Sequence, residues 1–240
     1  MGTIRDTPRY ILLSAFKAAL PIVIGYVALG IPCGILCAAA GLDIWMVILM
    51  SVFFYSGSGQ YMIPNLFLAG SSPLAICASV ALVSSRQTLY GSALVPFLQG
   101  VPRRLAVLCA SNVTDESFGV NIERFHLGNW RPSEAFLVNC FSQLSWIASN
   151  VIGVLLAGVL SIGTAIASFA MTSLFLCLML IQKRTRDNVV AGIGAVLGVI
   201  ACKLVGLSGP AILIGALIGI ACGMVAGRRH GKEASDDGMV

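Results

Sequence analysis

The residue most clearly placed for chemistry is Arg86, which stands in the middle of the apolar segment 74–98 and is followed by Gln87 and Tyr90. An ionised side chain inside a membrane segment costs at least about 2.5–3.5 kcal/mol, so such a residue indicates function by default. A guanidinium stays protonated and binds a carboxylate through two parallel hydrogen bonds. We therefore predict that Arg86 binds a substrate carboxylate, an internal acid, or each of them in turn. Tyr90 is a second candidate for binding the substrate.

Two neighbouring acids, Asp115 and Glu116, are the candidate partners of Arg86. Thr114 can cap a helix whose first turn contains both acids, an arrangement that the helix dipole favours. In a cavity opposite Arg86, either carboxyl group could bind and release a proton during a transport cycle or meet an ammonium group. If this segment lies at the membrane surface instead, both acids are solvated first-turn residues. The sequence leaves both interpretations open.

A run of small and polar residues interrupts the apolar segment 44–69. Its members Gly57, Ser58, Gly59 and Gln60 would offer backbone N–H and C=O groups and a side-chain amide, which suits a polar or zwitterionic ligand. The alternative is a kink that packs against another helix. We predict a substrate-binding role for these four residues.

Further side-chain amides are candidates for lining the same cavity. Asn112 comes just before the two acids, while Asn139 and Gln143 fall on one face of segment 135–160, together with Asn150. Hydrogen bonding between helices would explain the same residues equally well.

Composition identifies the elements that must hold these residues. The 240-residue chain is 58% hydrophobic and 10% charged, against about 25% charged residues in an average globular protein. The stretches 18–85, 135–182 and 188–227 contain only two charged residues, Asp43 and Lys203. A transmembrane helix needs about 20 mostly apolar residues. We therefore predict an all-α, polytopic helical membrane protein with about six to eight hydrophobic segments in a single integral membrane domain, 1–240.

Turn residues divide the chain into apolar segments, namely 16–40, 44–69, 74–98, 105–121, 135–160, 164–181, 188–205 and 210–227. Three of these contain helix-breaking residues, at Ser56–Gln60 with Pro64, at Ser84–Gln87 and at Asn112–Glu116. Ser84 and Gln87 have capping-box spacing for a helix that begins near Ser85. Backbone freed from helical bonding at membrane depth is tolerated only inside protein or beside a wet cavity. The pattern predicts a broken-helix substrate half, 16–121, and a scaffold, 135–227.

Positive charge predicts the orientation, because cytoplasmic loops carry an excess of Lys and Arg. The N-terminus 1–17, the basic turn Gln182–Asp187 and the tail 228–240 are expected to be cytoplasmic. Three full spans after the N-terminus would place Arg103 and Arg104 outside. Either this pair is an exception in an eight-span protein, or 74–98 and 105–121 are re-entrant.

Glycines spaced four residues apart indicate close helix packing, at Gly30/Gly34, at Gly194/Gly198 and along Gly215–Gly227. The only histidines, His126 and His230, lie outside the apolar segments, so neither an intramembrane Ser-His pair nor a histidine-ligated metal site is expected. The eight cysteines are interpreted as packing residues. The sequence predicts no enzyme, no cofactor and no metal, and the net charge of +5 indicates membrane orientation rather than nucleic-acid binding.

Three motifs together resemble the AzlC-type large subunits of branched-chain amino acid exporters, over roughly residues 16–227. They are Phe53–Gln60, Arg86–Leu94 with Pro96, and Thr114–Phe118. The chain departs from the family pattern at Ser84, where the family usually has Asn. It is also more polar and flexible at Gly57–Gly59, and both changes bear on the substrate.

The resemblance implies export of leucine, isoleucine or valine, and often methionine, across the bacterial inner membrane, coupled to the proton motive force. It also implies a small hydrophobic AzlD-type subunit as partner, for which the Gly215–Gly227 stripe is one possible contact surface, with a higher oligomer as a further option. Two alternatives stay open, a passive channel for small polar or anionic solutes and a non-transporting membrane assembly subunit.

Overall fold

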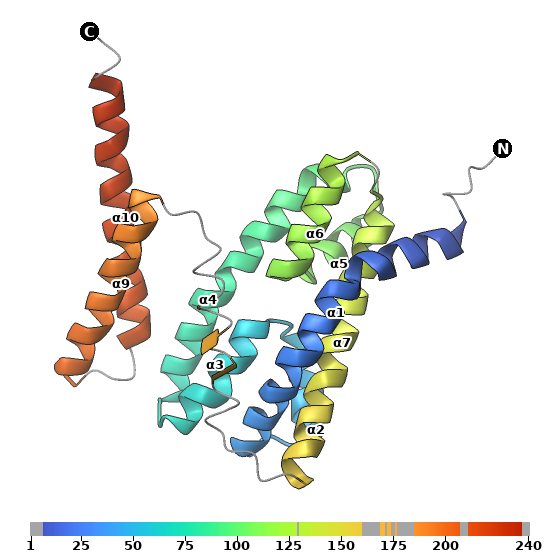
Figure 1. Cartoon of the computed structure of the whole chain (residues 1–240), viewed down its shortest axis with the longest axis horizontal. Coiled ribbons are helices and arrows are strands. Elements are labelled where there is room, and N and C mark those ends of the chain that lie inside the picture. The colour runs from blue at the N-terminus through green and yellow to red at the C-terminus, as the bar shows by residue number, and fades with distance from the viewer. Residues whose placement is uncertain are drawn as a thin grey trace. The chain divides into compact units, whose positions relative to one another are not determined.

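The computed structural model describes residues 7–128, 130–159, 169–170, 172–173, 176, 185–206 and 211–236 (Figure 1). Every regular element within these ranges is a helix, which confirms the predicted all-α class. Most of the predicted segment 164–181 and of the basic turn 182–187 lies outside the described residues, as do the turn residues 207–210. The side chains of the tail, from residue 227, lie outside them as well.

The chain forms two compact units, Met1–Asn65 with Val83–Thr172, and Leu66–Leu82 with Ser173–Val240. Every residue predicted to bind substrate, carry a proton or line the cavity belongs to the first unit. The second unit contains α9 and α10.

The first unit is built around two long helices, α1 (Pro8–Ala39) and α7 (Pro132–Val159), which run side by side (Figure 1). Within the described ranges, these are the two helices long and apolar enough to cross a membrane. Their backbones meet where glycines face each other: a Cβ atom on Gly34 would collide with the carbonyl oxygen of Asn150, and one on Gly153 with that of Ile31. This contact confirms the packing role predicted for the Gly30/Gly34 pair.

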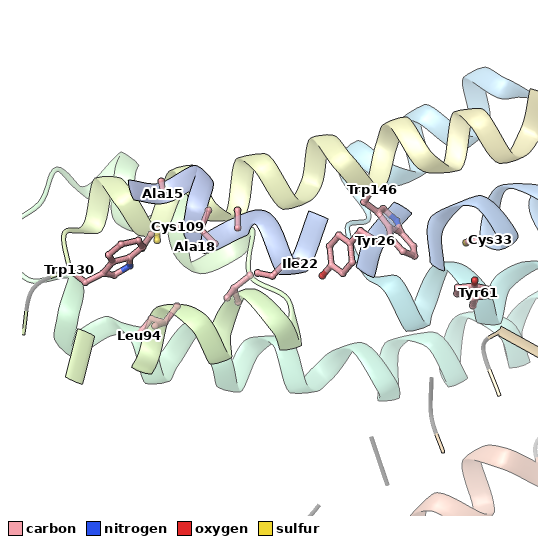
Figure 2. Close-up of a cluster of buried hydrophobic side chains, with 14 of the residues drawn as sticks. Ala15, Ala18, Ile22, Tyr26, Cys33, Tyr61, Leu94, Cys109, Trp130 and Trp146 are labelled. Atoms are coloured by element: carbon pink, nitrogen blue, oxygen red, sulfur yellow. The ribbon is translucent and has the colours of Figure 1, made fainter. Parts of the chain in front are cut away.

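Buried side chains fill the space between these helices and their neighbours (Figure 2). Cys33 and Tyr61 lie at one end of the drawn cluster and Trp130 at the other, with Tyr26 and Trp146 together between them. Large apolar side chains also face outward from several helices, as expected for helices that contact lipid. Examples are Ile24, Trp45, Phe53, Leu74 and Leu155.

The predicted segment 44–69 is two short helices, α2 (Ile44–Phe53) and α3 (Gly57–Leu68). Asp43 caps α2 by accepting a hydrogen bond from the Met46 N–H at 2.7 Å. At the start of α3 the Ser56 hydroxyl accepts from the Gly59 N–H at 3.3 Å. The break therefore covers residues 54–56, slightly earlier than predicted, and Gly57–Gln60 form the first turn of α3.

A second pair of short helices, α5 (Arg103–Ser111) and α6 (Asp115–His126), replaces the predicted segment 105–121. Thr114 caps α6 through a capping box with Ser117, because the Thr114 oxygen accepts from the Ser117 N–H and the Ser117 oxygen accepts from the Thr114 N–H. Asp115 and Glu116 occupy the first turn. The break, the cap and the position of the acids are all confirmed.

The third predicted break is wrong, because α4 (Pro73–Leu94) is continuous through Ser84–Gln87. A short 3-10 helix, η2 (Val95–Leu98), follows it. The polar residues of α4 bond to another element instead of interrupting their own helix. The Ser84 and Ser56 hydroxyls lie 3.4 Å apart, and the Gln87 amide donates to the Tyr55 carbonyl at 3.1 Å. Segment 74–98 is therefore not a re-entrant hairpin.

In the second unit, α9 (Arg186–Leu204) packs against α10 (Ala211–Asp236) through glycines. A Cβ atom on Gly198 would lie 3.0 Å from the Cα atom of Gly215, and one on Gly219 would lie 2.7 Å from the Ala191 carbonyl oxygen. Gly215 and Gly219 are thus used for packing inside this chain. This confirms the packing interpretation of these two positions.

Candidate functional site

Arg86 joins the first turns of two half-helices. Its Nη2 atom lies 2.7 Å from Oδ2 of Asp115, the first residue of α6. The same nitrogen donates to the Ser58 hydroxyl at 2.9 Å, at the second position of α3. Three residues that the sequence singled out separately therefore meet at one point.

The electrostatic environment of this point favours an anion. The N-terminal end of each half-helix carries partial positive charge from N–H groups that have no partner within the helix. Arg86 adds a full positive charge, and Asp115 is the acid paired with it. Neither side chain of the pair is fully buried, because 32% of the Arg86 side chain and 23% of the Asp115 side chain are exposed.

Only one oxygen of Asp115 takes part in this ion pair. The other, Oδ1, is buried and has no hydrogen-bond partner among the described residues. The Tyr55 hydroxyl is in the same condition. Buried polar atoms of this kind usually have a partner, so both atoms are available to a ligand that brings a donor.

Glu116 has a different partner from its neighbour. Its Oε2 atom lies 2.7 Å from the hydroxyl of Tyr26, a buried residue of α1. The Tyr26 hydroxyl also lies 2.7 Å from the Thr114 hydroxyl. The two adjacent acids therefore have chemically distinct partners, the Arg86 guanidinium for Asp115 and the Tyr26 hydroxyl for Glu116.

Tyr90 lies at the same site, where it interacts electrostatically with Asp115 and Arg86. Its ring stacks on Phe118 of α6, with ring centroids 4.7 Å apart and an interplanar angle of 19°. This pair provides an apolar surface next to the charged groups.

Gln60 is fully buried, and its side chain bonds to backbone groups at the break between α2 and α3. Its amide nitrogen donates to the carbonyls of Met50 and Phe54 at 3.1 and 2.7 Å. Its oxygen accepts from the Trp146 indole at 2.6 Å and from the Ser51 hydroxyl at 3.3 Å. These four bonds use the full capacity of a side-chain amide. In this conformation Gln60 is committed to protein groups.

Gln143 connects the two helix breaks. Its nitrogen donates to the carbonyls of Ser51 and Val52 at the end of α2, at 3.3 and 3.1 Å. Its oxygen accepts from the Asn112 amide at 3.0 Å, in the break before α6. The last carbonyls of a helix lack partners within it, and Gln143 supplies donors for two of them.

Asn139, one turn earlier on α7, supplies a donor to a carbonyl near the end of α5. Its nitrogen donates to the Cys109 carbonyl at 3.1 Å, and its oxygen accepts from Asn121 at 3.1 Å. Together, Asn112, Asn139 and Gln143 bond between helices, which is the second of the two roles considered for them.

The two glycines of α3 differ in the space around them. A Cβ atom on Gly59 would lie 2.7 Å from the Phe54 ring, whereas one on Gly57 would lie 3.8 Å from the nearest atom, in the Trp146 ring. A Cβ atom on Gly59 would therefore force the Phe54 ring to move, whereas Gly57 has room for one.

Three aromatic residues of this site, Tyr26, Tyr55 and Trp146, are not among those predicted from the sequence. Each has a polar atom inside an apolar segment, and a buried tyrosine or tryptophan usually needs a hydrogen-bond partner. That signal was present in the sequence. The identity of the partners was not, because Tyr26 and Glu116 are 90 positions apart.

These features define a class of protein. Discontinuous helices whose N-terminal ends converge on a charged group are how many secondary transporters bind their substrates in the membrane. The fold and the site are those of a helical membrane protein with a transport role.

The comparison with known families specifies this class further. The model of the AzlC protein family matches residues 21–160, more than half of the chain, so the chain belongs to the AzlC family. The matched range contains every predicted site residue. The resemblance noted from the three motifs is confirmed.

Individual relatives agree with this assignment. The chain is 30% identical over 200 residues to an uncharacterized membrane protein of Helicobacter pylori, covering 81% of this chain and 87% of the relative. It is 27% identical over 170 residues to the branched-chain amino acid transport protein AzlC of Bacillus subtilis, covering 70% and 66%. It is 28% identical over 215 residues to the inner membrane protein YgaZ of Escherichia coli, covering 86% and 85%. No solved structure matches the chain.

Proposed function

We propose that this protein is a secondary transporter that exports leucine, isoleucine, valine and methionine across the bacterial inner membrane. In this proposal it is the large subunit of a two-component exporter, with a small hydrophobic AzlD-type partner, cytoplasmic termini and proton coupling. Membership of the AzlC family supports a transport role, and the name of the Bacillus subtilis relative supports the substrate class.

The observation that carries the proposal is the Arg86–Asp115 ion pair at the start of two half-helices. A substrate carboxylate can replace the Asp115 oxygen on the guanidinium, because the two groups are chemically equivalent for Arg86. Asp115 then becomes free to accept the substrate's ammonium group. A zwitterion exchanges one ion pair for two without leaving a charge unpaired, so binding and release both stay accessible.

Two further features fit an amino acid with an apolar side chain. The stacked pair of Tyr90 and Phe118 supplies apolar surface beside the ion pair. The unpartnered Asp115 Oδ1 and Tyr55 hydroxyl can accept N–H donors from an ammonium group.

The experiment that tests the proposal is uptake of labelled leucine, valine and methionine into inside-out vesicles, with and without the small partner, under an imposed pH gradient. Concentrative uptake that needs both subunits and collapses with an uncoupler is expected. Equal flux in the presence and absence of the gradient would instead support a passive channel. Absence of flux for all three amino acids, with both proteins verified in the membrane, would overturn the branched-chain proposal.

A further inference from the structure

The two neighbouring acids of α6 have partners that respond differently to a proton. Arg86, the partner of Asp115, is permanently charged and can only donate hydrogen bonds. A proton on the Asp115 oxygen it faces would remove the acceptor and leave a guanidinium unpaired inside a membrane protein. Asp115 is therefore suited to stay ionised. It leaves Arg86 only when another carboxylate binds the guanidinium instead.

Glu116 is hydrogen-bonded to a group that both donates and accepts. Its Oε2 atom lies 2.7 Å from the Tyr26 hydroxyl. When Glu116 is ionised, Tyr26 donates to it. When Glu116 is protonated, the carboxyl group donates to the Tyr26 oxygen instead. The bond therefore exists in both protonation states and needs no movement of the heavy atoms.

The hydroxyl groups behind Tyr26 can reverse in the same way. The Thr114 oxygen lies 2.7 Å from the Tyr26 oxygen and 3.3 Å from the Ser117 hydroxyl. With Glu116 ionised, Thr114 donates to Tyr26. With Glu116 protonated, Tyr26 donates to Thr114, and the Thr114 hydroxyl turns to Ser117. Tyr26, Thr114 and Ser117 are all buried, which keeps water from replacing these bonds.

This chain of hydroxyls ends in the capping box of α6. Thr114 is the N-cap of the helix whose first residue is Asp115, and Ser117 is its capping partner. A change in the direction of these bonds thus reaches the backbone that positions Asp115 opposite Arg86.

Two further tyrosines lie near Glu116. Tyr55, from the break between α2 and α3, interacts electrostatically with Glu116 and lies next to the Tyr26 and Thr114 hydroxyls. Tyr90, from α4, interacts with Glu116 electrostatically. The charged groups nearby are Arg86 and Asp115, which pair with each other. On α7 the titratable neighbour is Cys140, which faces Tyr55.

We propose that Glu116 is the proton-binding residue of this protein and that the reversible hydroxyl chain Tyr26–Thr114–Ser117 links its protonation to the start of α6, while Asp115 serves as the resident counter-ion of Arg86. The step is simple: the Glu116 carboxylate takes up one proton to form the neutral acid and later releases it. The inference rests on the proposed function only in assigning this proton a use in transport.

Infrared difference spectra of the full chain in lipid bilayers, titrated with pH, test this assignment without any substrate. They record the C=O stretch of protonated carboxyl groups. The chain contains ten Asp and Glu residues, so the absorption has several components. We expect one component that grows as the pH falls, that is absent in E116Q and that D115N retains. Y26F removes a hydrogen bond that is stronger to the carboxylate than to the neutral acid, so it should shift the equilibrium by about five- to tenfold toward the protonated acid. Y10F, an exposed tyrosine on the same helix, is the matched control and should match the wild type.

Identical titrations of the carboxyl absorption in the wild type and E116Q would overturn the assignment, and so would loss in D115N of the same component that E116Q removes. The same holds if Y26F titrates like the wild type, since a purely structural tyrosine would leave the titration unmoved. In vesicles, E116Q should show transport that no longer responds to the pH gradient. The titration needs no substrate, so the two proposals can be judged separately. An unchanged titration in E116Q together with amino-acid transport would contradict the role of Glu116 alone. The expected titration without amino-acid transport would contradict the proposed function alone.

Discussion

Replacing Asp115 by Asn tests whether Asp115 competes with a substrate carboxylate for Arg86. In the wild type, a carboxylate that binds Arg86 must displace the Asp115 oxygen at 2.7 Å. Leucine compensates the displaced acid with its ammonium group. 4-Methylpentanoate, which has the same carbon skeleton without the amino group, cannot. D115N removes the competitor, so this analogue should bind more tightly to the variant than to the wild type.

The size of the effect follows from the exposure of the ion pair. Both side chains are about a quarter to a third exposed, so the pair is worth roughly 1 kcal/mol rather than the several kcal/mol of a fully buried pair. A difference of about 1–1.4 kcal/mol corresponds to about five- to tenfold in the dissociation constant. Leucine should change in the opposite direction, because it loses the acid that receives its ammonium group.

The assay is equilibrium binding of labelled leucine and labelled 4-methylpentanoate to purified protein in lipid bilayers. E123Q is the matched control, because Glu123 is an exposed acid on the same helix. Unchanged binding of 4-methylpentanoate in D115N, with the protein folded, would refute the competition between Asp115 and substrate.

Three further substitutions test the packing around the site. G59A should lower the thermal stability, because the added methyl would meet the Phe54 ring at 2.7 Å and force it to move, whereas G57A, whose added methyl would lie 3.8 Å from the nearest atom, should melt like the wild type; a G59A protein that melts like the wild type would contradict the packing. G34A should prevent close approach of α1 and α7 and greatly reduce the folded protein recovered from membranes, while G25A, with nothing within 4 Å of the added atom, should be recovered normally. Q143L should cost about 1–3 kcal/mol of stability, measured by thermal unfolding in detergent, because two carbonyls of α2 lose their donor.

The sequence was sufficient to predict the membrane class, two of the three helix breaks and the first turn of α6. These features depend on composition and on helix capping, and both are determined by residues close together in the sequence. The break at Ser84–Gln87 was predicted wrongly for a physical reason. Polar residues inside an apolar helix either interrupt its backbone or bond to a neighbouring element, and the sequence does not distinguish the two. Here the neighbour is the break at residues 54–56, whose Tyr55 carbonyl accepts from Gln87.

The candidate site shows the same limit. Arg86 and Asp115 could be paired from the sequence because an isolated charge at membrane depth needs a partner. Gln60 and Gln143 were expected in the cavity, and the structure shows both bonding to backbone carbonyls at the end of α2. Tyr26 was missed because its partner Glu116 is distant in the sequence. The residues next to a side-chain amide or hydroxyl in the sequence do not indicate which distant group is its hydrogen-bond partner.

The central claim is that the Arg86 guanidinium binds the substrate carboxylate with its planar fork. The most direct test is leucine uptake by R86K in vesicles at matched membrane levels, with R9K, an exposed arginine of α1, as control. Lysine keeps the positive charge but cannot form two parallel hydrogen bonds. We predict that R86K loses uptake while R9K keeps it. Wild-type uptake by R86K would contradict the claim.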